Sequence, residues 1–336
     1  MTRPQDAAKN LTARLAQFRE PDTRRSVWQL ASTAALFAGT WALMYFSLRL
    51  SYWLTLALAV PAAFLMIRLF IFQHDCGHGS FFKSSRASDI IGSILGVFTL
   101  TPYHYWKKTH AIHHATSGNL EHRGFGDIDT LTVSEYLALT RWGRFKYRVY
   151  RHPLVLFGVG AVLHFFVKHR LPTIVPRDWT RERRSIFWTD VGLATVIALM
   201  GALVGFRALL LVHLPVALGS CTIGVWLFYV QHQFEPTYWE HDAKWQYNDA
   251  ALVGSSFYRL PRILQWATGN IGLHHIHHLN ARIPNYRLQE VFESIPELQQ
   301  VTTLTLWQSL RCVSLALWDE RRQRLIRFRE VATAAS

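Results

Sequence analysis

Long apolar segments alternate with polar stretches along the chain and predict its fold class. Two short apolar runs, 90–100 and 154–167, predict buried or interfacial helices. Four longer segments are apolar almost throughout, and each has the length of about 20 residues that an α-helix needs to cross a bilayer: residues 27–48, 53–72, 187–206 and 208–230. The pattern predicts an all-α membrane protein with four transmembrane helices.

The polar stretches between these segments predict the rest of the organisation. They are an amino-terminal segment and two parts of a helical cap, and the second part contains an expected amphipathic helix at 304–331. The units are a cytosolic amino-terminal segment at 1–26, a first transmembrane hairpin at 27–72, a cap segment at 73–186, a second hairpin at 187–230 and a second cap segment at 231–336.

The basic residues predict the orientation of the chain. The net charge is +14, and 33 of the 36 lysines and arginines fall in the amino-terminal segment and the two cap segments. The other three are Arg49, Arg207 and Arg68. The positive-inside rule therefore predicts that both termini and the cap are cytoplasmic, with a bacterial inner membrane as the expected location. Four spans argue against a nucleic-acid-binding protein, and three scattered cysteines suit a reducing compartment.

Histidines gather in three clusters on the cap side of the predicted spans. The first cluster has imidazoles at i and i+4, and the other two have them at i, i+3 and i+4. These spacings put the imidazoles of a cluster on one face of a helix, where they can share a metal ion. The eight residues are His74, His78, His110, His113, His114, His274, His277 and His278. Eight nitrogens exceed the four that tetrahedral zinc accepts, so the count predicts two metal ions.

Further residues near the clusters are expected to support the metals. His232 lies two residues beyond the fourth apolar segment and is a ninth candidate ligand. Metal-bound imidazoles usually donate their second N–H to a carboxylate or carbonyl. Asp75, Asn270, His275 and His104 are expected to stand behind the ligands in this way, with further acidic candidates at Glu121, Asp127, Asp129, Glu240 and Asp242. Lone histidines are expected to be structural: His122, His152, His164, His169, His213 and His241.

Imidazole binds both zinc and iron, so the two metals are distinguished by the reactions that each can support. Zinc would serve hydrolysis with three protein ligands and a water, and it has no redox chemistry. Non-haem iron activates dioxygen, which is what an unactivated C–H bond requires. The number of histidines favours iron.

At these residues the chain resembles the membrane fatty-acid desaturases, in their bacterial and plant acyl-lipid branch, most like the omega-6 or delta-12 type. The motifs are HDCGH at 74–78, WKKTHAIHH at 106–114 and GNIGLHHIHHL at 269–279, followed by RIPNY at 282–286. The resemblance implies a four-helix membrane bundle under a cytosolic cap with a histidine-ligated diiron centre. It also implies an enzyme, an oxidoreductase that uses O2 and two electrons to place a cis double bond in the acyl chain of a membrane lipid.

The resemblance also bears on the source of the electrons and on the alternative functions. His152 and Pro153 are followed by Leu154, so the His-Pro-Gly-Gly haem motif of fused cytochrome b5 domains is absent. A separate ferredoxin, rubredoxin or cytochrome b5-like carrier is therefore expected. Hydroxylation or acetylenation of an acyl chain is the nearest alternative reaction, and a histidine-rich membrane metal transporter is the alternative from another class. Aromatic residues expected to line an acyl tunnel are Tyr103, Trp106, Phe228, Tyr229 and Trp266.

Overall fold

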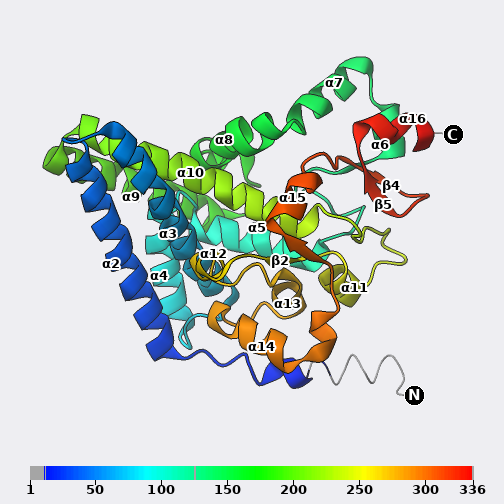
Figure 1. Cartoon of the computed structure of the whole chain (residues 1–336), viewed down its shortest axis with the longest axis horizontal. Coiled ribbons are helices and arrows are strands. Elements are labelled where there is room, and N and C mark those ends of the chain that lie inside the picture. Colours follow the sequence, from blue (N-terminus) through cyan, green and yellow to red (C-terminus); the bar gives the residue numbers. More distant parts are fainter. Residues whose placement is uncertain (1–10, 12, 125, 335–336) are drawn as a thin grey trace.

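The computed structural model describes residues 11, 13–124 and 126–334. Four of its helices are long and apolar enough to cross a membrane: α2 (Thr23–Ser47), α3 (Tyr52–His78), α9 (Thr180–Val204) and α10 (Phe206–His232). The protein is therefore mostly helical with four candidate transmembrane helices, as predicted. The α2–α3 and α9–α10 turns lie together at the left of Figure 1.

The two hairpins are joined by close packing of α3 against α10. A Cβ added at Gly219 of α10 would lie 3.2 Å from the Cβ of Ala63 of α3. Ala62, Met66, Val212 and Val216 are almost completely buried in the same contact. Small residues let the helix backbones approach, which is how helices associate in membranes. This contact fixes the spacing of α3 and α10.

Both central helices extend past the apolar segments that predict them. The sequence places the end of the second span at Phe72, whereas α3 runs on to His78 and ends at Gly79, whose φ is 66°. A glycine in this left-handed conformation is a usual helix end. In the same way α10 includes His232. The first histidine cluster and His232 therefore belong to the last turns of the long helices themselves.

The cap consists of short helices between and after the hairpins. The first part holds α4 (Ser85–Phe98), α5 (Tyr103–Thr116), α6 (Val133–Ala138), α7 (Arg141–Tyr150), the π-helical η1 (Leu154–Gly160), α8 (Ala161–Phe166) and the 3-10 turns η2 (Lys168–Arg170) and η3 (Pro172–Ile174). The second part holds α11 (Tyr247–Leu252), α12 (Arg262–Ala267), α13 (His274–Leu279), η4 (Asn285–Arg287), α14 (Leu288–Ser294) and η5 (Pro296–Gln299). The runs at 90–100 and 154–167 fall mainly in α4 and in η1 with α8. The helix α7 and the helical segment Leu154–Arg170 form a pair bent by 63°, which could count as a fifth, broken span.

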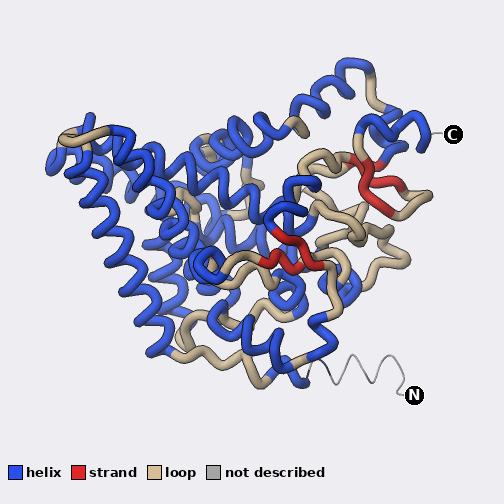
Figure 2. The backbone as a smooth tube through the Cα atoms, in the orientation of Figure 1, coloured by secondary structure: helices blue, strands red, loops and turns tan. Residues whose placement is uncertain are grey.

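The carboxyl-terminal region differs from the single amphipathic helix expected at 304–331. It contains β3 (Thr303–Thr305), α15 (Leu306–Cys312), β4 (Leu317–Asp319), β5 (Arg324–Ile326), η6 (Phe328–Glu330) and α16 (Val331–Ala334). β3 pairs in parallel with β2 (Phe257–Arg259), and β4 pairs with both β5 and β1 (Leu131–Thr132). Figure 2 shows these strands among the loops of the cap. The apolar residues of the strands are buried, namely Leu304, Leu317, Trp318, Leu325 and Ile326, whereas Leu306, Trp307 and Leu310 of α15 are exposed.

A buried arginine joins four segments of the cap at the end of α10. Arg151 is 4 % exposed. Its guanidinium donates to the Asp129 carbonyl at 3.0 Å, to Oε1 of Gln233 at 2.9 Å and to the Leu315 carbonyl at 2.8 Å. It also lies 5.6 Å from the centre of the Tyr229 ring. Arg151 thus ties α7 to the residue beside His232.

Candidate metal centre

Nine histidine side chains from four helices converge in two adjacent groups. The five-histidine group consists of His74, His78, His110, His114 and His277, and the four-histidine group consists of His113, His232, His274 and His278. Within each group the ligand nitrogens lie within 4.8 Å of one another. The structure therefore brings together all eight histidines of the three clusters and His232.

The helices distribute their histidines between the groups. In α5, His110 and His114 are one turn apart and join the five-histidine group, whereas His113 joins the four-histidine group. In α13, His277 goes to the first group, and His274 and His278 go to the second. Only α3 and α10 each supply a single group. Because α5 and α13 serve both groups, they hold the two sets of nitrogens side by side.

The hydrogen-bond partners of Nδ1 in His113 and His232 indicate which ring nitrogen carries the proton in each residue. Nδ1 of His232 lies 3.2 Å from the Gly254 carbonyl, which can only accept, so this nitrogen carries the proton. Nδ1 of His113 lies 2.6 Å from the Asp127 carboxylate and donates in the same way. In neutral imidazoles, both Nε2 atoms then present lone pairs. These two Nε2 atoms are 3.1 Å apart.

Facing lone pairs at that distance repel each other unless a cation lies between them. In the five-histidine group Nδ1 of His74 lies 3.0 Å from Asp75, so its Nε2 presents a lone pair, and this atom lies 3.0 Å from Nε2 of His277. The buried Nε2 atoms of His78 and His278 have no hydrogen-bond partner. This donor set, bare imidazole nitrogens aimed at common points, fits metal ions.

Burial keeps the cap histidines in the form that binds metals. It lowers the pKa of His110, His114, His274, His277 and His278 well below the ordinary value, and the neighbouring imidazoles lower each pKa further. These imidazoles are therefore neutral near pH 7, and a neutral imidazole is the species that coordinates a metal.

The spacing of the nitrogens bears on the kind of metal. Two nitrogens that bind one metal at roughly 2.0–2.1 Å lie about 3.0 Å apart at a right angle and about 3.4 Å apart in a tetrahedron. The Nε2 atoms of His277 and His114 are 2.9 Å apart, and those of His274 and His232 are 3.0 Å apart. The five-histidine group also offers one nitrogen more than the four that tetrahedral zinc accepts.

The four residues that the sequence predicts behind the ligands differ in their contacts, and only one of them contacts a histidine of the two groups. Asp75 contacts His74 as expected. Nε2 of His275 lies 3.0 Å from the Leu298 carbonyl, so this imidazole ties α13 to η5 instead of supporting a ligand. The backbone N–H of His104 donates to Ser185 of α9, and its side chain lines a surface groove along α4. The Asn270 side chain donates to the Asn285 carbonyl.

Only two of the five expected tunnel residues adjoin the histidines. Trp106 stacks on His110 with 4.4 Å between ring centres, and Phe228 lies 5.0 Å from His113 and 5.2 Å from His232. Tyr103 and Tyr229 are core residues whose hydroxyls donate to the Cys76 and Cys312 carbonyls. Trp266 is partly exposed and covers the Arg68 guanidinium. Phe228 also lines a narrow cleft with Ile128, Tyr238 and Trp239, next to His232.

Some supporting residues were not predicted from the sequence. The Gly254 carbonyl and Asn285 have no local sequence pattern that predicts them, because every residue has a backbone carbonyl and Asn285 lies 210 residues from the Asp75 that it contacts.

The lone histidines supply no nitrogen to either group, namely His122, His152, His164, His169, His213 and His241.

The comparisons with known proteins agree with this site. The family model described as fatty acid desaturase matches residues 50–309. The chain belongs to the fatty acid desaturase family. It is 46% identical over 323 residues to a fatty acid desaturase of Bacillus subtilis, covering 96% of this chain and 91% of the relative. Family members of this kind are membrane oxidoreductases of lipid metabolism, so this desaturase is an enzyme with a histidine cluster that could hold metal.

Two further relatives have names that specify the substrate. The chain is 26% identical over 317 residues to an sn-1 oleoyl-lipid 12-desaturase of Anabaena variabilis, covering 88% of this chain and 84% of the relative. It is also 26% identical over 300 residues to an sn-1 acyl-lipid omega-3 desaturase (ferredoxin) of Synechocystis, covering 86% of this chain and 81% of the relative. These similarities place the desaturase near the acyl-lipid branch of its family.

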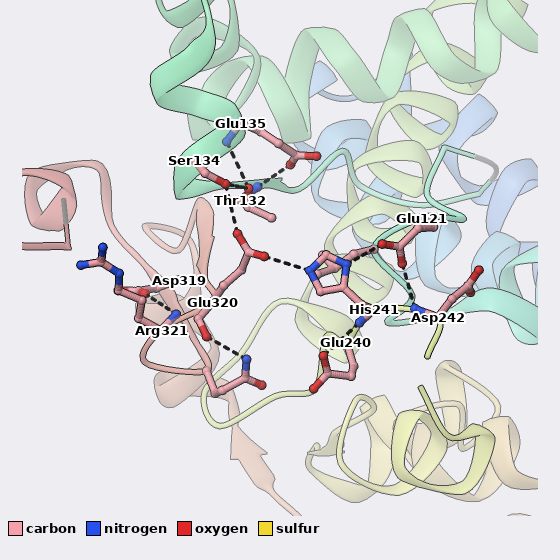
Figure 3. A network of polar contacts seen from close by, with 12 residues as sticks. Glu121, Thr132, Ser134, Glu135, Glu240, His241, Asp242, Asp319, Glu320 and Arg321 are labelled. Carbon is pink, nitrogen blue, oxygen red and sulfur yellow. Dashed lines mark hydrogen bonds and ion pairs between the residues drawn. The ribbon is translucent and has the colours of Figure 1, made fainter. Parts of the chain in front are cut away.

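A polar network on the cap surface holds together the loops that follow α5 and α10. His241 bonds through Nδ1 to Glu121 and lies 2.9 Å through Nε2 from Glu320, which also accepts from Ser134 at 3.1 Å (Figure 3). Asp242 donates its backbone N–H to Glu121 at 2.9 Å. The imidazole can satisfy both carboxylates only when it is protonated, because a neutral imidazole has one N–H.

This network predicts a small loss of stability at alkaline pH. The hydrogen bonds to Glu121 and Glu320 raise the pKa of His241 above its ordinary value. Its stabilisation is therefore fully present below the unfolded pKa of about 6.5 and is lost as pH rises through the folded pKa. We expect the melting temperature of the wild type minus that of His241→Gln to fall on going from pH 6 to pH 9, by a modest amount because the site is exposed. The exposed His152→Gln variant is the control, and a difference that stays constant with pH would contradict the mechanism.

Proposed function

We propose that the protein is an O2-dependent acyl-lipid desaturase whose two histidine groups each hold one iron ion. The observation that carries this proposal is the convergence of nine histidines into two adjacent groups, in each of which the ligand nitrogens lie within 4.8 Å of one another. Family membership supports the reaction class, and the relatives, which are named desaturases, favour it over hydroxylation, acetylenation and metal transport. The reaction joins O2, two electrons and two protons with the two hydrogens of adjacent methylenes to give a cis double bond and two waters.

The proposed ligand set gives each part of the site a role. Bound iron supplies the dioxygen and one-electron chemistry that removes hydrogen from an unactivated methylene, which zinc lacks. Asp75 and Asp127 hold the Nδ1 protons of His74 and His113, so that Nε2 of each ligand stays free for metal. Trp106 packs on His110, and Phe228 packs on His113 and His232, so these rings shield part of the site.

The proposed substrate is an acyl chain on a membrane lipid, with the electrons from a separate carrier. The relatives named acyl-lipid desaturases support the lipid, and the word ferredoxin in the name of the Synechocystis relative supports a separate donor. A rubredoxin or a cytochrome b5-like protein would do the same chemistry.

Fatty-acid analysis of a host that lacks the expected double bond tests the function. We expect expression of the protein to produce a new cis-unsaturated fatty acid by mass spectrometry, and expression of His278→Ala at equal protein level to produce none. Purified enzyme with reduced ferredoxin should convert phospholipid acyl chains and act poorly on acyl-coenzyme A. A hydroxylated product would refute desaturation, and a preference for the thioester would refute the lipid substrate.

We further propose that the termini and the metal centre face the cytoplasm, in a bacterial inner membrane. The distribution of basic residues supports this orientation. Cysteines introduced at Arg144 and at Arg207 should label from opposite sides of the membrane, with Arg144 on the cytoplasmic side. Labelling of the Arg144 position from the periplasm would show that α7 and α8 form a true fifth span.

A further inference from the structure

A line of hydrogen bonds links the turn before α13 to the first histidine of the five-histidine group. Asn270 is in the left-handed conformation, with φ 58°, and its Nδ2 donates to the Asn285 carbonyl at 3.0 Å. Asn285 in turn contacts Asp75, and Asp75 contacts His74. Asn285 and Asp75 are 2 % and 3 % exposed, so the line is shielded from water.

Asn285 holds Asp75 with two donors at once. Its backbone N–H and its Nδ2 both donate to Oδ2 of Asp75, at 2.8 and 2.9 Å. This leaves Oδ1 to accept from Nδ1 of His74 at 3.0 Å. A carboxylate that is held at one oxygen by two donors from the same residue has little freedom to rotate, so the direction of its second oxygen is fixed.

The position of Oδ1 of Asp75 determines which ring nitrogen of His74 is available to a metal. As long as Oδ1 accepts from Nδ1, the proton of the neutral imidazole stays on Nδ1 and Nε2 carries the lone pair. Nε2 of His74 lies 3.0 Å from Nε2 of His277, which comes from α13, in the same part of the chain as Asn285. Asn285 therefore sets the position of an α3 ligand relative to an α13 ligand.

We propose that Asn285 is a positioning residue for the five-histidine group, acting on the metal site through Asp75 and His74. This inference rests on the proposed function, because it assumes that the group holds iron. In the four-histidine group Asp127 acts on His113 directly. A change at Asn285 should therefore affect one of the two irons, and a change at Asp127 should affect the other.

The test compares Asn285→Ala with Asn285→Asp in the full-length protein, loaded with two equivalents of ⁵⁷Fe(II) in detergent. Iron release to a chelator and the Mössbauer spectrum are measured before any assay of turnover. Alanine keeps the backbone donor and removes Nδ2, and we expect one of the two irons to be held about 10- to 100-fold more weakly. Aspartate has nearly the shape of asparagine but places a second carboxylate against Asp75, so we expect a larger loss.

The order of these two variants separates positioning from packing. If Asn285 only filled space, the isosteric Asn285→Asp would be the milder change, and that result would overturn the proposal. Equal loss of both irons would also overturn it. Asn270→Gly, which keeps the left-handed backbone and removes the bond to the Asn285 carbonyl, gives a gentler test if a variant at 285 fails to fold, and one iron should again be weakened.

Controls distinguish this inference from the proposed function. Asn280→Ala changes a nearby buried asparagine at the end of α13, whose Oδ1 accepts the backbone N–H of Arg282, and it should keep both irons. Asp127→Asn should weaken the iron that Asn285→Ala leaves intact. A wild-type protein that binds no iron would sink the proposed function, whereas two tightly bound irons in wild type and in Asn285→Asp would sink only the inference.

Discussion

Loss of either His78 or His278 is expected to abolish activity, and the two losses should not add. Each residue presents an unpartnered buried Nε2 to a different group. We expect His78→Ala and His278→Ala each to lower turnover by on the order of 10³-fold or more, and the double variant to be no worse than the single ones, because ligands of one centre act as a unit. Product formation in the heterologous host and iron per chain measure this.

The matched control for the histidine series is His122→Ala. His122 is an exposed imidazole that lies 3.3 Å from Asp242, outside both groups. It should retain full activity and both irons. A fully active His278→Ala enzyme at normal protein level would be incompatible with a two-metal centre.

Replacement of Arg151 by alanine is expected to cause the largest loss of stability in the cap. It would leave Oε1 of the buried Gln233 side chain without its donor, whereas the Asp129 and Leu315 carbonyls would keep the Tyr147 and Tyr229 hydroxyls as donors. We expect the free energy of unfolding to fall by about 2–3 kcal/mol, because one buried acceptor loses its charged donor and the other hydrogen bonds and the packing of the guanidinium are lost.

Thermal unfolding in detergent micelles measures the effect of the Arg151 change. Arg151→Lys keeps the charge but cannot reach three acceptors in different directions, so it should fall between wild type and alanine. The exposed Lys146→Ala on the same helix is the control and should melt like wild type. Equal melting of Arg151→Ala and Lys146→Ala would show that the contacts of the guanidinium are not stabilising.

The sequence was most informative where the signal is local. A span is a continuous apolar segment, and the spacing of His110, His113 and His114 is a property of one helix turn, so both could be predicted without a tertiary structure. Helix ends were less certain, because α3 and α10 continue into polar residues that a hydropathy pattern assigns to the cap. His78 and His232 therefore lie inside the long helices.

Other features depend on contacts between distant segments. Nothing in one helix shows that His113 joins a different group from His114, since this follows from where α10 and α13 pack. Tyr103 and Tyr229 were expected in a tunnel, but an aromatic residue near a site has the same sequence signal as one in the core. The strands β1 to β5 are two or three residues long, too short for an alternating pattern to appear.

The division of the ligands along the chain also sets the order in which the centre can be assembled. Each group combines histidines from before the second hairpin with histidines of α13, near the carboxyl end. During synthesis neither group is complete until residue 278 has left the ribosome, by which time all four long helices have been made. Under the proposed function, a metal would gain its full ligand set only after all four long helices have been made, so loading would be a late step of biogenesis, and an excised cap without α3 and α10 would lack part of each ligand set.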